Sequence, residues 1–137
     1  MSEQNKAIMR RIYDEVFSNG NLAVVDELVV KDVIEHEEGP QGSEGLKQTV
    51  TMFRTAFPDL QFSVEDMIAE GDKVVSRITM RGTHKGEFMG IPATDKTFAV
   101  QAIDIIRFAN GKAVEHWGVT DSAAMMQQLG AAPPVSG

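Results

Sequence analysis

The chain has 137 residues, 42% of them hydrophobic and 24% charged, and these values are typical of one globular domain. Its formal net charge of −7, with no cluster of Lys or Arg, argues against nucleic acid and anionic membrane surfaces as partners. The lack of cysteine excludes disulfides, thiol nucleophiles and Cys-ligated metals, while charged first residues and the lack of a long apolar run predict a cytoplasmic protein.

The first part of the chain predicts three helices. Apolar residues recur at three- and four-residue steps over residues 8–17, which is the stripe of an amphipathic helix. Asn21 is expected to cap a second, shorter helix, which leads into a short strand over residues 32–36. A third helix is expected to have Ser43 as its N-cap and to end before Pro58.

From residue 60 onward, alternating apolar and polar residues predict antiparallel strands. Asn110-Gly111 is a dipeptide favoured in two-residue hairpin turns. In that hairpin, and without a bulge, Asp104 pairs with Trp117 and both share a face with Asp121.

The order of helices, then strands, predicts an α+β fold with helices packed on one face of a curved sheet. We expect a single domain over residues 1–130. Residues 131–137, rich in Pro, Ala and Gly, are expected to form a flexible tail.

Asp121 is the main candidate for acid/base chemistry. A carboxyl in apolar surroundings beside the Trp117 indole has a raised pKa, which suits it to proton transfer near neutral pH. The alternative is that Asp121 simply caps the helix expected from Ser122 onward. Asp104 is a second candidate, although a one-residue slip in register would turn it to solvent.

The histidines also have two interpretations. His36 is either a proton shuttle at the mouth of a pocket or a strand-end histidine held by a neighbouring acid, and the same alternatives apply to His84 and His116. We expect no metal site, because the three histidines lack the close spacing that fixes metal-ligand geometry. The sequence also lacks a nucleophile elbow, a phosphate-binding loop and a dinucleotide fingerprint.

Three ordered segments carry a family resemblance: DVIEH, AFPDLQFSVEDMIAEGDKVVSRITMRGTHKGEFMGIPAT and IIRFANGKAVEHWGVTD. On these segments the chain resembles the SnoaL-like polyketide cyclases, also called ester cyclases, up to about Gly130. The resemblance implies the cone-shaped fold of the nuclear-transport-factor-2-like superfamily, with three N-terminal helices on a strongly curved antiparallel sheet around a deep apolar pocket. It also implies a homodimer or larger assembly formed through the outer sheet face. One departure is GIPATD at residues 90–95, where family members often read GIPPTG, so a loop bordering the pocket differs in stiffness and charge.

The resemblance implies a cofactor-independent enzyme that closes a ring by an intramolecular aldol reaction on a small apolar carbonyl compound. Asp121 would be its general acid/base, and we expect His36, ahead of His116 or Asp104, to hydrogen-bond the enolate oxygen. The alternatives are a steroid-isomerase-like proton transfer, which would use the Tyr13 hydroxyl, and a noncatalytic binder of small molecules. The residues expected to hold the substrate are Trp117, Asp104, His116, Tyr13, Phe17, Phe53, Phe57 and Met89.

Overall fold

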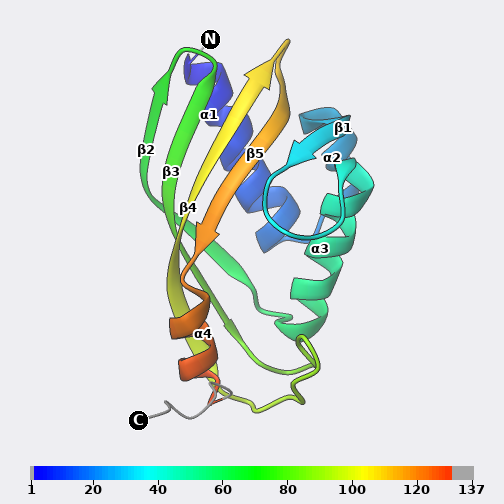
Figure 1. The fold of residues 1–137 in the computed structure, drawn as a ribbon, viewed down its shortest axis with the longest axis vertical. Helices are drawn as coiled ribbons and strands as arrows, with labels where there is room; N and C mark the ends of the chain where they lie inside the picture. The colour runs from blue at the N-terminus through cyan, green and yellow to red at the C-terminus, as the bar shows by residue number, and fades with distance from the viewer. Residues whose placement is uncertain (1, 131–137) are drawn as a thin grey trace.

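The computed structural model describes residues 2–130, and the expected tail over 131–137 lies outside them. The helical segments are α1 (Ser2–Arg11), the π-helix η1 (Ile12–Ser18), the 3-10 helix η2 (Leu22–Val24), α2 (Val25–Leu28), α3 (Gly42–Ala56) and α4 (Ser122–Gln128). The strands are β1 (Val29–Glu35), β2 (Gln61–Glu70), β3 (Lys73–Thr83), β4 (Thr97–Ala109) and β5 (Lys112–Thr120). This order confirms the α+β class, with three N-terminal helical regions formed by α1 with η1, η2 with α2, and α3 (Figure 1). Within residues 2–130, no helix is both long and apolar enough to cross a membrane.

The five strands form one sheet in the order β1-β5-β4-β3-β2. Neighbouring strands are antiparallel except for β1, which pairs in parallel with β5. The expectation of a fully antiparallel sheet is therefore wrong at this edge. The chain between β1 and β5 contains α3 and three strands, so it is long enough for the crossover that a parallel pair needs.

The helices cover one face of the twisted sheet, with α1 crossing behind the strands and α3 beside β1 (Figure 1). The predicted helical stripe is confirmed, because Ile8, Met9, Ile12, Tyr13 and Val16 are all buried. They form the main part of a core with inward-facing residues of β3 and β4. This packing places one face of α1 and η1 directly over the sheet interior.

The ends of the other helices test the predicted capping residues. The Asn21 side chain accepts a hydrogen bond from the Ala23 N–H at 3.2 Å, which confirms it as a cap. The expected cap at Ser43 is wrong, since α3 already begins at Gly42 and the Ser43 side chain is buried within it. The helix does end before Pro58, as predicted.

A second apolar cluster fills the end of the molecule near α4. Phe57, Leu60 and Leu129 are fully buried there, and Phe17 and Phe62 pack against both clusters. The inner face of β4 therefore runs from one core cluster to the other.

Candidate active site

A β-bulge decides which side chains of β5 face the interior. The Asn110-Gly111 turn forms as predicted, with positive φ at both residues. A few residues beyond it the register shifts by one, so that Asp104 pairs with Gly118 rather than Trp117. Because side chains alternate along a strand, this shift moves His116 to the inner face and Trp117 to the outer face. The prediction that Asp104 and Trp117 share a face is therefore wrong.

Asp104 lies on the inner face of β4 and accepts hydrogen bonds from two directions. Its Oδ2 accepts from the Tyr13 hydroxyl at 2.8 Å, and its Oδ1 lies 2.8 Å from Nε2 of His116. The Tyr13 oxygen also contacts the hydroxyl of the buried Ser76 on β3. Since a phenol has one proton and Tyr13 gives it to Asp104, the Ser76 hydroxyl donates to Tyr13. The Asp104 side chain is only 13% exposed, so these bonds fix a mostly buried carboxylate.

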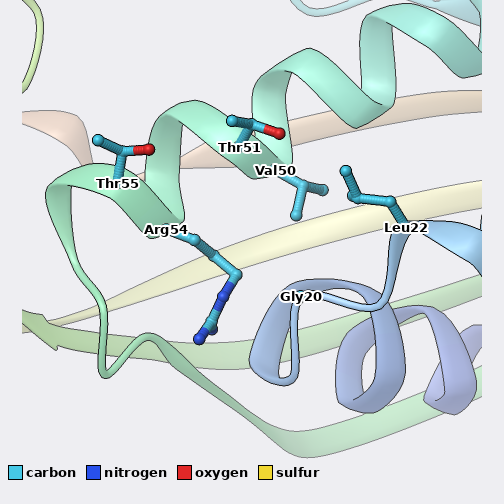
Figure 2. Close-up of a pocket in the computed structure, with 6 residues that line it drawn as sticks. All are labelled: Gly20, Leu22, Val50, Thr51, Arg54 and Thr55. Carbon is cyan, nitrogen blue, oxygen red and sulfur yellow. The ribbon is translucent and has the colours of Figure 1, made fainter.

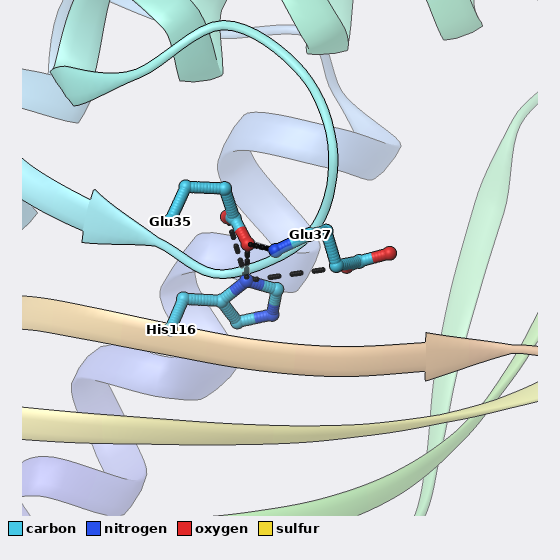
Figure 3. Close-up of side chains that lie close together, drawn as sticks. All are labelled: Glu35, Glu37 and His116. Carbon is cyan, nitrogen blue, oxygen red and sulfur yellow. Dashed lines mark hydrogen bonds and ion pairs between the residues drawn. The ribbon is translucent and has the colours of Figure 1, made fainter.

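His116 lies between two carboxylates. Its Nε2 faces Asp104, and its Nδ1 lies 2.7 and 2.8 Å from the two carboxylate oxygens of Glu35, at the end of β1 (Figure 3). Ionised carboxylates only accept hydrogen bonds, so a ring that bonds to two of them carries both protons. His116 is therefore an imidazolium held between Asp104 and Glu35.

The pKa values in this cluster agree with that assignment. Burial alone would lower the pKa of His116, but its hydrogen bonds to Asp104 and Glu35 outweigh burial and raise the pKa to about 10. Burial, followed by the negative charge of Asp104, raises the pKa of the Tyr13 phenol. Near neutral pH the cluster thus combines a carboxylate, an imidazolium and a neutral phenol.

Glu37 completes the cluster from the loop that follows β1. Its Oε1 lies 4.0 Å from Nδ1 of His116 (Figure 3), and its side chain is 43% exposed. Donor atoms of Glu35, Glu37 and His116 lie within 4.8 Å of one another, a spacing that a metal ion could bridge. A metal would have to displace the proton from Nδ1 of His116, which the high pKa of this ring opposes.

A family model described as SnoaL-like polyketide cyclase matches residues 7–129. The chain belongs to this family. This match confirms the resemblance to the SnoaL-like polyketide cyclases that the three sequence segments indicated. The chain is 28% identical to the aklanonic acid methyl ester cyclase of Streptomyces sp. (strain C5), over 95% of this chain and 83% of that protein. It is 29% identical to the nogalonic acid methyl ester cyclase of Streptomyces nogalater, over 83% of this chain and 89% of that one.

The solved structures agree with the family assignment. TsrD from Streptomyces laurentii superposes with a TM-score of 0.89 at 26% sequence identity, covering 96% of this chain and 98% of that chain. A putative SnoaL-like polyketide cyclase from Jannaschia sp. CCS1 superposes with a TM-score of 0.86 at 28% identity, covering 97% of this chain and 95% of that chain, so the fold is that of this family. Both curated relatives described above are named as cyclases, which favours an enzyme of the polyketide cyclase type over a noncatalytic binder.

In this SnoaL-like chain Asp121 is exposed and lies just beyond β5. Its Oδ1 accepts a hydrogen bond from the Ala124 N–H at 3.1 Å, so it caps α4. The expectation that Asp121 lies in an apolar hollow beside Trp117 is wrong, because the strand ends at Thr120 and the chain turns directly into the helix. The helix-cap alternative describes the geometry. A catalytic role for Asp121 stays a prediction.

His36 and Trp117 lie together on the outer side of the β1–β5 edge. Their rings stack with centroids 4.7 Å apart and planes only 4° from parallel. His36 also bonds to Glu115 through Nε2 at 2.6 Å, and Glu115 accepts from Arg107. His36 therefore does not join the Asp104 cluster, and its expected role at the substrate stays a prediction.

The apolar candidates are spread over the molecule. Phe17 stacks on Phe62 at 4.7 Å, whereas Phe53 and Phe57 belong to the region around the second core cluster. Met89 is 70% exposed in the loop between β3 and β4. A cavity of about 250 Å³ lies between α3 and the turn before η2 (Figure 2), but none of the predicted substrate residues lines it. It is lined by Gly20, Leu22, Val50, Thr51, Arg54 and Thr55. The predicted deep pocket stays a prediction.

Three members of the cluster, Tyr13, Asp104 and His116, were candidates from the sequence. Three others were not predicted as functional residues: Glu35, Glu37 and Ser76. Strand alternation through DVIEHEE places the side chains of Glu35 and His36 on opposite faces of the sheet. This pattern could have indicated that Glu35 faces the interior if His36 faces outward. The parallel pairing that brings Glu35 to His116 has no local sequence signal.

Proposed function

We propose that this protein is a cofactor-independent cyclase that closes a ring by an intramolecular aldol reaction on a small apolar carbonyl compound. We further propose that its acid/base centre is the cluster formed by Asp104, His116 and Tyr13. The observation that carries this proposal is the mostly buried Asp104 carboxylate, with His116 on one oxygen and Tyr13 on the other. The names of the cyclases in the family support the reaction class.

The reaction needs a proton acceptor and a stabilised negative charge. Asp104 removes a proton from a carbon flanked by carbonyl groups, and the resulting enolate attacks a second carbonyl of the same molecule. A carbon–carbon bond forms, and the attacked carbonyl becomes an alkoxide that takes up a proton. The imidazolium of His116 provides a fixed positive charge next to this developing negative charge. Tyr13 orients Asp104 and needs no proton transfer of its own.

The steroid-isomerase-like alternative finds less support. It needs the Tyr13 hydroxyl as a donor to a substrate oxygen, but this hydroxyl already donates to Asp104. Phe17, Phe53 and Met89 stay predictions for contacts to the apolar body of the substrate.

The proposal predicts different results for two aspartates. Asp104→Asn should lower ring closure of aklanonic acid methyl ester by about 10²- to 10⁴-fold, since the amide cannot accept the proton. It should also stop exchange of the acidic C–H proton with deuterated water, measured by proton NMR against the rate without protein. Asp121→Asn is the matched control and should leave both rates unchanged, since Asn also caps helices well. Loss of both activities in Asp121→Asn but not in Asp104→Asn would show that Asp121, and not Asp104, is the base.

We also propose that the protein is a homodimer formed through the outer sheet face. Exposed apolar side chains gather there: Ile34, Ile68, Val75, Ile103 and Val119. Four of them form one patch: Ile68 pairs with Val75, Val75 pairs with Ile105, and Ile103, two residues along the same face of β4, pairs with Val119. A contiguous apolar surface of this kind is typical of association sites.

A further inference from the structure

The loop after β1 holds Glu37 over the inner face of β5. The His36 N–H donates to the His116 carbonyl at 3.0 Å, and the Glu37 N–H donates to the Glu35 carboxylate at 2.8 Å. The side chain of Gln41 closes the loop by bonding to both the N–H and the carbonyl of Glu35. The backbone at Glu37 is thereby fixed next to His116.

Gly118 leaves no side chain between the carboxylates of Glu37 and Asp104. A β-carbon at position 118 would lie 2.6 Å from Oε1 of Glu37 and 2.6 Å from Oδ1 of Asp104, closer than any real contact. The two carboxylate oxygens are therefore at most twice that distance apart. Any side chain at this position would separate them.

The two carboxyl groups differ in their surroundings. Asp104 is mostly buried and held by Tyr13 and His116, whereas no hydrogen bond to the Glu37 carboxylate forms within residues 2–130. Partial burial raises the pKa of Glu37, although 43% of its side chain stays exposed; the charge of His116 opposes this rise, and the negative charges of Glu35 and Asp104 add to it. Two neighbouring carboxyls in different environments are suited to opposite roles, one as the base and one as the acid.

We propose that Glu37 is the general acid of the ring closure and gives its proton to the new alkoxide. This inference rests on the proposed function, in which Asp104 is the base. The carbon acid loses its proton to Asp104, the carbon–carbon bond forms, and the alkoxide takes the proton of Glu37 to become a hydroxyl. Asp104 then releases its proton to solvent and the Glu37 carboxylate takes one up from solvent, so both groups return to their starting states. The reaction is an isomerisation, so protons and electrons balance without a co-reactant.

The test compares Glu37→Gln with Glu38→Gln, a neighbouring and exposed glutamate of the same loop. With aklanonic acid methyl ester as the probe, Glu37→Gln should lower ring closure by about 10²- to 10⁴-fold. Exchange of the substrate C–H proton with deuterated water should continue near the native rate, because Asp104 still forms the enolate. Glu38→Gln should behave like the native protein in both assays.

Other results would overturn the inference. Native ring closure in Glu37→Gln would remove Glu37 from the reaction, and a parallel loss of exchange and closure would show that it does not act only as the acid. Native protein that neither exchanges nor closes the ring would contradict the proposed function instead. Carboxyl-carbon NMR tests Glu37 independently of any substrate: the pKa of its carboxyl should lie above the ordinary glutamate value of about 4.3. An ordinary midpoint would overturn the role as an acid.

Discussion

At the scale of single residues, the charge of His116 is the property on which the cluster depends. An imidazole left alone in this mostly buried position would lose its proton, but Asp104 and Glu35 hold the proton on each nitrogen. In turn, the cation lets two carboxylates approach each other in the sheet interior. Removing either charge leaves an unpaired ion, which is more costly than the intact pair.

This arrangement predicts that stability depends on pH. The pKa of His116 rises from its ordinary value of 6.5 to about 10 on folding, so its contribution is complete below pH 6.5 and is lost as the pH rises through about 10. Each tenfold change in proton affinity corresponds to about 1.4 kcal/mol, so urea unfolding should show a decline of several kcal/mol across this window. His116→Gln should be less stable at pH 6.5 but should lose this part of the decline. His36→Gln, on the outer face, should keep the decline in stability. If the native protein showed the same pH dependence as His116→Gln, His116 would not be the charged group proposed here.

Individual residues of the site were partly predictable. Tyr13, Asp104 and His116 were candidates because of their side-chain chemistry. Nothing in the sequence favours His116 over His36 as the histidine of the site. Only the bulge and the parallel strand separate them, since these place one ring between acids and the other against Trp117.

At the scale of elements, β5 shows where pattern reading fails. The Asn110-Gly111 signal gave the correct turn, but the bulge near Val114 occurs in the segment KAVEHW, which has no glycine or proline to mark it. One unpaired residue is enough to reverse every later side chain. By contrast, α1, α3 and the hairpin could be predicted, because apolar spacing and turn residues are local features of the sequence.

The helix α4 provides the prediction at this scale. Asp121→Ala should cost about 1 kcal/mol in the free energy of unfolding, since α4 loses the acceptor that holds the Ala124 N–H. Asp121→Asn should cost only a few tenths, because Asn caps equally well. Urea unfolding of the two variants measures the difference. An equal cost for both would mean that the negative charge, and not the cap, matters at this position.

At the scale of the whole molecule, the two sheet faces have different roles. The inner face carries both core clusters and the Asp104 cluster, while the outer face carries exposed apolar residues around Trp117. The sequence indicated apolar residues on both faces of strands such as β3, but it placed Asp104 and Trp117 on the same face. It could not predict the order of the strands, which depends on contacts between distant segments.

Self-association through the outer face can be tested with one charge. Val119 is 75% exposed in the apolar patch, and Val119→Asp should turn a dimer into a monomer in light scattering at micromolar concentration, since a carboxylate would have to be desolvated in the interface. Met89→Asp is the matched control, because Met89 is similarly exposed but lies in a loop away from the sheet. A native monomer, or a Val119→Asp dimer, would contradict the proposed interface.

The parallel pairing of β1 with β5 also has a consequence for folding. It joins Glu35 to His116, which are 81 residues apart, and no turn links the two strands. Because closing so long a loop costs more entropy than forming a hairpin, we expect this pairing to form after the hairpins of β2 to β5. Until then Glu35 stays in water without its cation, so a nascent chain on the ribosome has no reaction centre until β5 has emerged.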